Sequence, residues 1–322
     1  MGLLWVTPRA RLRRLVARDA ASVLAGRTVL VTGASSGIGE ATSVLAAARG
    51  AHVLLVARRA DELERVRAAI EAAGGRASTY VADLTDLDAI DALVARVLAE
   101  VGTVDYLVNN AGRSIRRSLE LSYDRFHDFE RTMAINYFGP VRLTMGLLPA
   151  MRAQGFGRVV NVVTWGVQMK APKFAAYIAS KTALDTWSRI AGRETYADGV
   201  TFTNMRFSLV ATAMVVPTDA YDNRASMSAE QAAAKVVRAL EDRPVTWDTV
   251  PGRVGAVVNV VAPRLSDALM ARFHRSVPDS AAARGGSEQQ ERRDDAGRDH
   301  GPAEGGVGQL PADPRADVAA DQ

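Results

Sequence analysis

The chain has 322 residues, of which 48% are hydrophobic and 24% are charged, and its formal net charge at pH 7 is +4. This composition is typical of a soluble globular protein, and it excludes a collagen, a coiled coil and wholesale disorder. The sequence contains no cysteine, which excludes a disulfide framework, a thiol nucleophile and an iron–sulfur cluster. Its four histidines form no metal-ligand spacing, so we expect no protein-bound metal.

Charge is distributed unevenly along the chain. Residues 281–322 carry a net charge of −4, which leaves +8 on residues 1–280. A basic globular part favours anionic ligands such as phosphates or coenzyme A, and it equally favours membrane surfaces or nucleic acid. The sequence has no zinc finger, RNA-recognition signature or basic stripe with interleaved aromatic residues, so we expect no nucleic-acid partner.

The N-terminal arm, residues 1–25, is rich in arginine. No apolar run approaches the roughly 20 residues that span a bilayer. Five arginines between residues 9 and 18 interrupt the apolar region that a signal peptide needs, so we expect a cytoplasmic protein. Residues 3–16 place apolar side chains among arginines. We interpret this pattern first as a helix packed on its own domain or a frayed terminus, with an amphipathic segment in peripheral contact with a membrane as the alternative.

Residues 26–275 alternate short β-branched runs with longer segments of helical period. The runs that predict strands are RTVLVT, AHVLLVA, STYVA, VDYLVNN, GRVVNVVT and VTFTNMRF. Strict alternation of strand and helix indicates βαβ units, and nearly continuous apolar runs indicate strands that are buried on both faces. The sequence therefore predicts an α/β fold, a single domain built on a doubly wound parallel sheet of the Rossmann type.

The last part of this domain contains an irregular segment near residues 208–228, followed by a helical pattern over 228–241. Such sheets bind ligands at the carboxyl ends of their strands, so the irregular segment is interpreted as a substrate loop, with an ordinary surface connection as the alternative. Residues 281–322 have few aliphatic and no aromatic side chains, which predicts a disordered tail.

A glycine-rich turn lies between the first predicted strand and the helix that follows it. Glycines there permit a tight turn and let a pyrophosphate approach the backbone, while the helix N-terminus supplies N–H donors. The spacing is GxxxGxG, and the strand before it and the helix after it favour a dinucleotide site over a turn that binds nothing. The residues expected to bind the cofactor here are Gly33, Ser35, Ser36, Gly37, Ile38 and Gly39.

Two arginines, Arg58 and Arg59, follow the second predicted strand, where an acidic residue would bind the ribose of NAD. Arginine at this point accommodates the 2′-phosphate of NADP, so we expect NADP(H) as the cofactor and Arg58 as a ligand. The alternative is a pair of solvated surface arginines. Asp83, after the third strand, is placed either to bind the adenine amino group or to cap the helix that follows Leu84.

Tyr177 and Lys181 stand four residues apart in a helical pattern, so their side chains face the same way. A lysine ammonium in that position stabilises the tyrosine phenolate and lowers its pKa, which makes the tyrosine a general acid. Thr164, at the end of the fifth predicted strand, offers a hydroxyl to a substrate carbonyl. The chain has only four lysines, so a lysine within such a motif is informative.

Taken together, these motifs resemble those of the short-chain dehydrogenase/reductase family over roughly residues 25–275. The matching segments are TGASSGIG (32–39), NNAG (109–112), AINYFG, YIASK and VATAM. The resemblance implies an active site formed by Asn136, Thr164, Tyr177 and Lys181.

The same resemblance assigns further roles. Lys181 is expected to hold the nicotinamide ribose, and Asn136 to anchor a water that links Lys181 to solvent. Asn110, Tyr177 and Thr212 are expected at the cofactor. Asn109 and Gly112 are expected to stabilise the central sheet. A homo-oligomer is implied, formed through the helices after the fourth and fifth strands.

Two positions depart from the family pattern. Thr164 stands where serine is usual, which keeps the hydroxyl but adds a methyl group and restricts χ1. Phe207 and Ser208 replace the usual Pro-Gly after the sixth strand. An intact Tyr177 and Lys181 favour an enzyme over a non-catalytic NADP(H) sensor, the hypothesis that these departures suggest.

Several longer segments are similar to the fatty acyl-CoA reductase branch of the family. They are NNAGRSIRRSLE, DRFHDFERTMAINYFGPVRL, KFAAYIASKTALDTWSR, MVVPT and APRLSDALMARFHRSVPDS. This similarity implies an NADPH-dependent reductase of long-chain acyl-CoA, with a general ketone, aldehyde or 3-oxoacyl reductase as the alternative. Arg113, Arg116 and Arg117 are then expected either at the coenzyme A phosphates or in a solvated basic turn. Ala211 stands where related members commonly carry arginine.

Overall fold

A computed structural model describes residues 22–212, 226–280 and 283 of the chain. Residues 1–21 of the predicted arm therefore lie outside the described residues. The same holds for the predicted tail apart from Ala283, and for residues 213–225 of the predicted substrate loop.

Seven parallel strands form one sheet in the order β3-β2-β1-β4-β5-β6-β7. Their bounds are β1 Thr28–Thr32, β2 His52–Ala57, β3 Arg76–Val81, β4 Tyr106–Asn109, β5 Gly157–Thr164, β6 Val200–Phe207 and β7 Thr246–Asp248. The first six confirm the predicted strands and the predicted doubly wound α/β fold. The short edge strand β7 has no counterpart in the prediction.

Helices connect the strands, because parallel pairing requires crossover connections. Their bounds are α2 Gly37–Ala48, α3 Ala60–Ala72, α4 Leu87–Val101, α5 His127–Met133, α6 Gly139–Ala153, α7 Gly166–Met169, α8 Ala175–Glu194, α9 Ala229–Asp242, α10 Val250–Val261 and α11 Pro263–Ser276. A 3-10 turn, η1, spans Glu120–Ser122, and a π-helical turn, η2, spans Ala134–Phe138. The helix predicted over 228–241 is α9, and Ser228 caps it through a reciprocal hydrogen-bond pair with Gln231.

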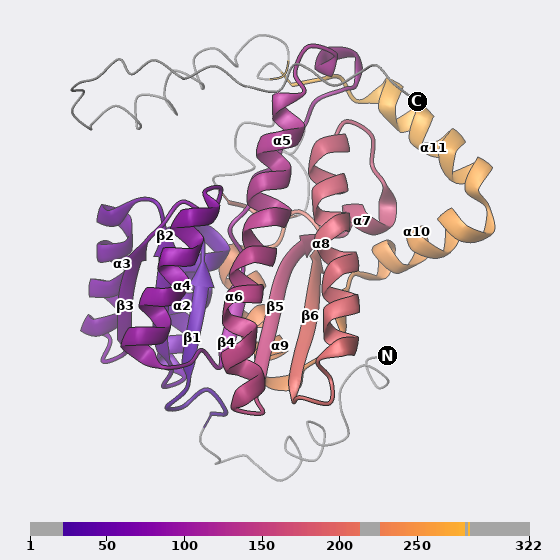
Figure 1. Cartoon of the computed structure of the whole chain (residues 1–322). Coiled ribbons are helices and arrows are strands. Elements are labelled where there is room, and N and C mark those ends of the chain that lie inside the picture. Colours follow the sequence, from indigo (N-terminus) through magenta and orange to yellow (C-terminus); the bar gives the residue numbers. More distant parts are fainter. Residues whose placement is uncertain (1–21, 213–225, 281–282, 284–322) are drawn as a thin grey trace, which may run out of the picture. The chain divides into compact units, whose positions relative to one another are not determined.

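Each face of the sheet is covered by helices, so the domain has two hydrophobic cores (Figure 1). Successive residues of β2 alternate between them: Val53 and Leu55 belong to the core beneath α2, α3 and α9, and Leu54 and Val56 to the core beneath α4, α6 and α8. All four side chains are fully buried. Burial on both faces explains why this strand has an unbroken apolar sequence.

Strand β1 lies between β2 and β4. The chain adds β2 and β3 on one side of β1 and then β4 to β7 on the other side, so the direction in which the sheet grows reverses next to β1. In doubly wound folds a crevice opens at the carboxyl ends of the strands where this reversal occurs. The connections after β1 and β4 diverge there, and they carry the glycine turn and the NNAG segment.

Helix α8, which carries the Tyr177-Lys181 motif, is fixed to the sheet by a partly buried ion-pair network. Arg206 on β6 donates two hydrogen bonds to Asp185 on α8, at 2.9 and 2.7 Å, and a third to Asp248 on β7, at 3.1 Å. A bidentate pair of this kind sets orientation as well as distance. None of the helices in the described ranges combines the length and apolarity needed to cross a bilayer.

Candidate active site

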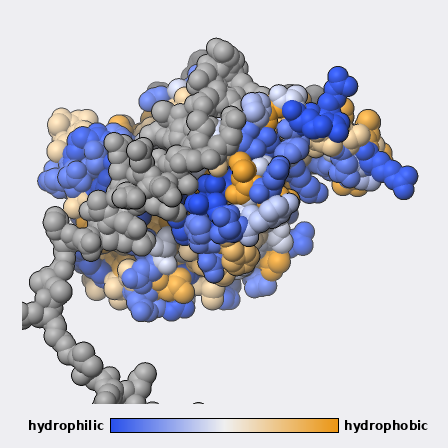
Figure 2. All heavy atoms as spheres, turned by 90° about the horizontal axis from the view of Figure 1, so that it is seen from above, coloured by the Kyte–Doolittle hydropathy of each residue, from blue (hydrophilic) through white to orange (hydrophobic). Residues whose placement is uncertain are grey.

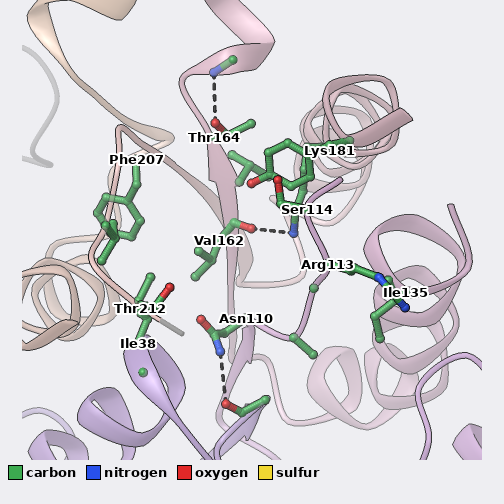
Figure 3. A pocket seen from close by; sticks show the side chains of 18 of the residues that line it. Ile38, Asn110, Arg113, Ser114, Ile135, Val162, Thr164, Lys181, Phe207 and Thr212 are labelled. Atoms are coloured by element: carbon green, nitrogen blue, oxygen red, sulfur yellow. Dashed lines mark hydrogen bonds between the residues drawn. The ribbon is translucent and has the colours of Figure 1, made fainter. Parts of the chain in front are cut away.

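A cavity of about 710 Å³ opens at the carboxyl ends of the strands (Figure 3). The residues that line it come from both ends of the domain's sequence, from Gly33 to Val277. The predicted site residues that line it are Gly33, Ser35, Ser36, Gly37, Ile38, Arg58, Asp83, Asn110, Thr164, Tyr177, Lys181 and Thr212. Two further predicted residues, Gly39 and Asn136, lie behind the lining and support it.

The glycine turn is shaped by backbone requirements. Gly33 and Gly37 have positive φ angles, +64° and +57°, which glycine adopts without a steric penalty. A Cβ atom on Gly39 would lie 2.1 Å from the carbonyl oxygen of Gly33, so no side chain fits there. No side chain caps the first turn of α2, so its backbone N–H groups form a cradle suited to a phosphate.

Asn110 holds this turn against the loop after β4. Its side-chain amide donates to the carbonyl of Thr32 at 3.0 Å, and the Thr32 hydroxyl accepts hydrogen bonds from the backbone N–H groups of Asn110 and Ala111. The two connections that diverge from the sheet are thereby tied together at the floor of the cavity (Figure 3).

The two arginines after β2 line the cavity, but their contacts differ. The Arg58 side chain is 72% exposed, with its guanidinium 3.9 Å from a carboxylate oxygen of Asp83. Arg59 donates to the hydroxyl of Ser35 at 3.3 Å, so it joins the glycine turn directly. The alternative that Asp83 caps a helix is wrong, because Asp86 caps α4 while Asp83 accepts hydrogen bonds from Thr85.

Lys181 reaches the cavity from α8 and is almost completely buried. Its ammonium donates a hydrogen bond to the carbonyl of Val162 at 2.9 Å (Figure 3). Burial disfavours the charged form and lowers the pKa of Lys181 to about 8. The ammonium is therefore still mostly charged at neutral pH, and it sits where water cannot screen it.

Tyr177 lines the cavity one helical turn before Lys181, as the spacing predicts. Its ring packs against Phe174 with a centroid distance of 6.4 Å. Thr164 ends β5, and its hydroxyl accepts a hydrogen bond from the backbone N–H of Gly166 at 3.1 Å. This contact leaves the hydroxyl hydrogen available for donation into the cavity.

Asn136 lies in the π-helical turn η2 and is fully buried. Its side chain accepts from the backbone N–H of Arg113 at 2.9 Å and donates to the Arg113 carbonyl at 2.8 Å. It also donates to the hydroxyl of Ser180 at 3.0 Å. A Cβ atom on Gly112 would lie 2.8 Å from the Asn136 carbonyl oxygen and 3.2 Å from the Lys181 nitrogen, so Gly112 allows these two groups to lie close together.

The residues that depart from the family pattern also line the cavity. The Phe207 ring packs against Trp247 of β7, with a centroid distance of 5.2 Å. Thr212 lies against the glycine turn, where its methyl carbon is 3.2 Å from the position of a Cβ atom on Gly37. Phe207 thus has a structural partner on the edge strand.

The three arginines of the basic loop after NNAG make different contacts. Arg113 and Arg116 line the cavity, and Arg116 donates to the carbonyl of Pro278 at 2.8 Å. Arg117 is 12% exposed and pairs with Asp128 at 3.3 Å, which contradicts a solvated position for it. Arg117 also donates to the carbonyl of Ala283, at 3.0 Å.

Lys173 fixes the same C-terminal segment from the other side. It donates to the carbonyl of Val277 at 2.6 Å and pairs with Asp279 at 3.2 Å. Asp279 in turn accepts from the backbone N–H of Ser118 at 3.1 Å. The stretch from Val277 to Asp279 is therefore held over the cavity by charged groups of two earlier loops.

Sequence reasoning missed the apolar part of this lining. Phe174 and Ile178 come from the start of α8, and Phe273 and Val277 from the end of α11. The available signal was a spacing of four, which joins Phe174 to Ile178 and Phe273 to Val277 and puts the members of each pair on one helical face. The cavity therefore combines three features: the polar cradle of the glycine turn, the three polar side chains of Thr164, Tyr177 and Lys181, and an apolar lining.

The family model for short chain dehydrogenase matches residues 27–223, more than half of the chain. The chain belongs to the short-chain dehydrogenase family. It is accordingly an oxidoreductase with a Rossmann-type fold, and members of this family use a nicotinamide cofactor, as its resemblance implied.

This short-chain dehydrogenase is also similar to individual proteins, among them two relatives and one solved structure. It is 46% identical to the fatty acyl-CoA reductase of Acinetobacter baylyi, with 82% of this chain and 89% of the relative covered. It is also 46% identical to a fatty acyl-CoA reductase of Mycobacterium tuberculosis, over 77% of this chain and 85% of the relative. A metagenomic short-chain oxidoreductase solved in complex with NADP is 30% identical, with a TM-score of 0.60, and 68% of this chain and 93% of that one are covered.

Proposed function

We propose that this short-chain dehydrogenase reduces long-chain fatty acyl-CoA to fatty aldehyde with NADPH. The observation that carries the proposal is its 46% identity to the Acinetobacter baylyi fatty acyl-CoA reductase over 89% of that protein. The apolar lining from Phe174, Ile178, Phe273 and Val277 supports it, because an acyl chain needs apolar surface next to the reacting carbonyl.

The residues of the glycine turn fit a dinucleotide. The cradle formed by Gly33, Gly37 and the uncapped start of α2 suits a pyrophosphate, and Asn110 holds it in place. Arg58 and Arg59 suit a 2′-phosphate, since β2 ends at Ala57 and offers no carboxylate for a free ribose hydroxyl. When bound, NADPH supplies the hydride.

The remaining chemistry belongs to this chain's own residues. The hydroxyls of Thr164 and Tyr177 donate hydrogen bonds to the carbonyl oxygen as negative charge develops on it. Tyr177 then delivers its proton as the general acid, and the nearby Lys181 ammonium stabilises the phenolate that remains. The product of a thioester is a hemithioacetal, which collapses to the aldehyde and free coenzyme A.

Asn136 acts as a positioning residue in this scheme. Its hydrogen bonds to Arg113 and Ser180 connect the loop after β4 to the helix that carries Tyr177 and Lys181. The general acid and the floor of the cofactor site therefore keep a fixed separation.

The test is a turnover assay on the purified chain with mass identification of products. NADPH and NADH are compared against acyl-CoAs of increasing chain length and against matched aldehydes and ketones. Aldehyde and free coenzyme A formed from long-chain acyl-CoA, with NADPH preferred, is the expected result. Turnover of ketones or aldehydes alone would instead identify a general carbonyl reductase, and NADPH binding without any turnover would identify a sensor.

A further inference from the structure

Helices α10 and α11 lie outside the two helical layers that cover the sheet (Figure 1). Their outer surface carries exposed apolar side chains, here called the α10–α11 apolar face. It consists of Val250, Val254, Val257, Val260, Val261, Leu265 and Leu269. Their exposed fractions run from 51% for Leu269 to 81% for Val260, far above those of core residues. Seven large apolar side chains exposed on two adjoining helices indicate an interaction site.

The orientation of α10 is fixed by its inner side. A Cβ atom on Gly255 would lie 2.0 Å from the sulfur of Met169, so α10 packs closely against α7 at this point. Asn259 donates to the carbonyl of Gln168 at 2.7 Å and accepts from Ser266 of α11 at 2.6 Å. These contacts hold α10 to α7 and α11 to α10.

The helical spacing then places the valines on the other side. Val250, Val254, Val257 and Val261 follow one another at intervals of four, three and four residues, which defines one stripe of a helix. Because Gly252, Gly255 and Asn259 occupy the inner stripe, the valine stripe faces outward. The exposure of these valines is therefore built into the packing of the hairpin.

Charge on the hairpin selects among partners. Residues 250–276 contain four arginines and one aspartate, a net charge of +3 with histidine neutral. Arg264, Arg272 and Arg275 are exposed on α11 and form no ion pair with any residue in the described ranges. Figure 2 shows orange apolar residues interleaved with blue charged ones at the end of the molecule where α11 lies.

We propose that the α10–α11 apolar face docks onto the surface of an anionic lipid membrane. Twelve residues of α10 extend about 18 Å, too short to cross a bilayer but suited to lie in its interface. The valines and leucines enter the acyl boundary, and the three free arginines contact lipid phosphates. Phe273 of α11 lines the cavity, so docking brings the apolar lining of the site close to the lipid.

The test is flotation of the full chain with vesicles of phosphatidylcholine, alone or mixed with phosphatidylglycerol. Binding to the mixed vesicles, weakened by salt, is expected. The triple variant Val254→Gln, Val257→Gln, Val261→Gln should bind at least about tenfold more weakly, since it removes apolar surface. Arg272→Gln and Arg275→Gln should each cost roughly fivefold.

A matched control changes an arginine and an exposed apolar residue elsewhere. Arg193→Gln with Tyr196→Gln alters the end of α8, where Tyr196 is 75% exposed, and should leave vesicle binding unchanged. Circular dichroism of each variant verifies the fold. None of these measurements depends on turnover, so they stand apart from the proposed function.

Three results would overturn the proposal. The first is absence of binding to anionic vesicles. The second is undiminished binding by the valine variant, which would assign the membrane contact to another part of the chain, such as residues 3–16. The third is a wild-type dimer that the valine variant dissociates, measured by light scattering, which would make the face an interface between two copies.

Discussion

Lys181 on α8 and Val162 on β5 are joined by a hydrogen bond of 2.9 Å between the ammonium and the backbone carbonyl. Two residues further along β5 stands Thr164, and one turn earlier on α8 stands Tyr177. The bond therefore sets the spacing between the helix that carries the phenol and the strand that carries the hydroxyl. Every prediction about the chemistry of this site depends on that spacing.

Burial of Lys181 predicts a pH dependence of stability. Its pKa falls from 10.5 to about 8 on folding, so between these values the unfolded chain binds more protons than the folded one. The free energy of unfolding therefore increases as pH rises through this window, so the folded state becomes more stable, by roughly 3 kcal/mol in the limit. Urea unfolding of wild type and Lys181→Met, without cofactor, should give curves that diverge from pH 8 upward. Parallel curves would contradict a buried, titrating ammonium.

Replacing Asn136 by alanine should destabilise the fold around the site. The change leaves the N–H and carbonyl of Arg113 and the hydroxyl of Ser180 without their buried partner. We expect a loss of roughly 2 kcal/mol or more in the free energy of unfolding. Ser180→Ala removes one of the three bonds and should cost less. Equal losses from the two variants, measured by urea denaturation, would count against the bridging role of Asn136.

Arg58 and Arg59 should determine cofactor preference. Replacing either by alanine removes a cation suited to the 2′-phosphate and should raise the Michaelis constant for NADPH roughly tenfold, with little change for NADH. Arg76→Ala is the matched control, because Arg76 is exposed at the opposite end of β3. Equal effects on both cofactors would show that the arginines act on the fold instead.

The Lys173–Asp279 pair should govern access of substrate. Lys173→Met releases the stretch that carries Val277, so the Michaelis constant for the carbonyl substrate should rise several-fold while NADPH affinity stays constant. Asp279→Asn should act in the same direction. A double-mutant cycle with both changes should show non-additive effects, and strict additivity would indicate that the two side chains do not act together.

Much of the fold and the cofactor side of the site follows from local sequence. Continuous apolar runs predict the buried strands, and glycines required by positive φ predict the turn after β1. The spacing of Tyr177 and Lys181 places both in the cavity because a helix repeats every 3.6 residues. Each of these signals lies within a few residues of the feature that it predicts.

The rest depends on contacts between distant segments. Phe273 and Val277 line the cavity because α11 and the chain after it return to loops more than 100 residues earlier, where Lys173 and Arg116 hold them. The pairing of Arg117 with Asp128 likewise depends on tertiary packing. By sequence Asp83 is a possible helix cap, whereas the geometry of the turn gives that role to Asp86.

The most direct test of the account is NADPH oxidation by wild type and Tyr177→Phe with the same acyl-CoA substrate. NADPH affinity is measured on both proteins by fluorescence. Tyr177→Phe keeps the ring and its packing against Phe174 but removes the proton that the mechanism delivers. The account predicts unchanged NADPH affinity and a turnover rate lowered at least about a hundredfold. Unchanged turnover would contradict the assignment of Tyr177 as the general acid.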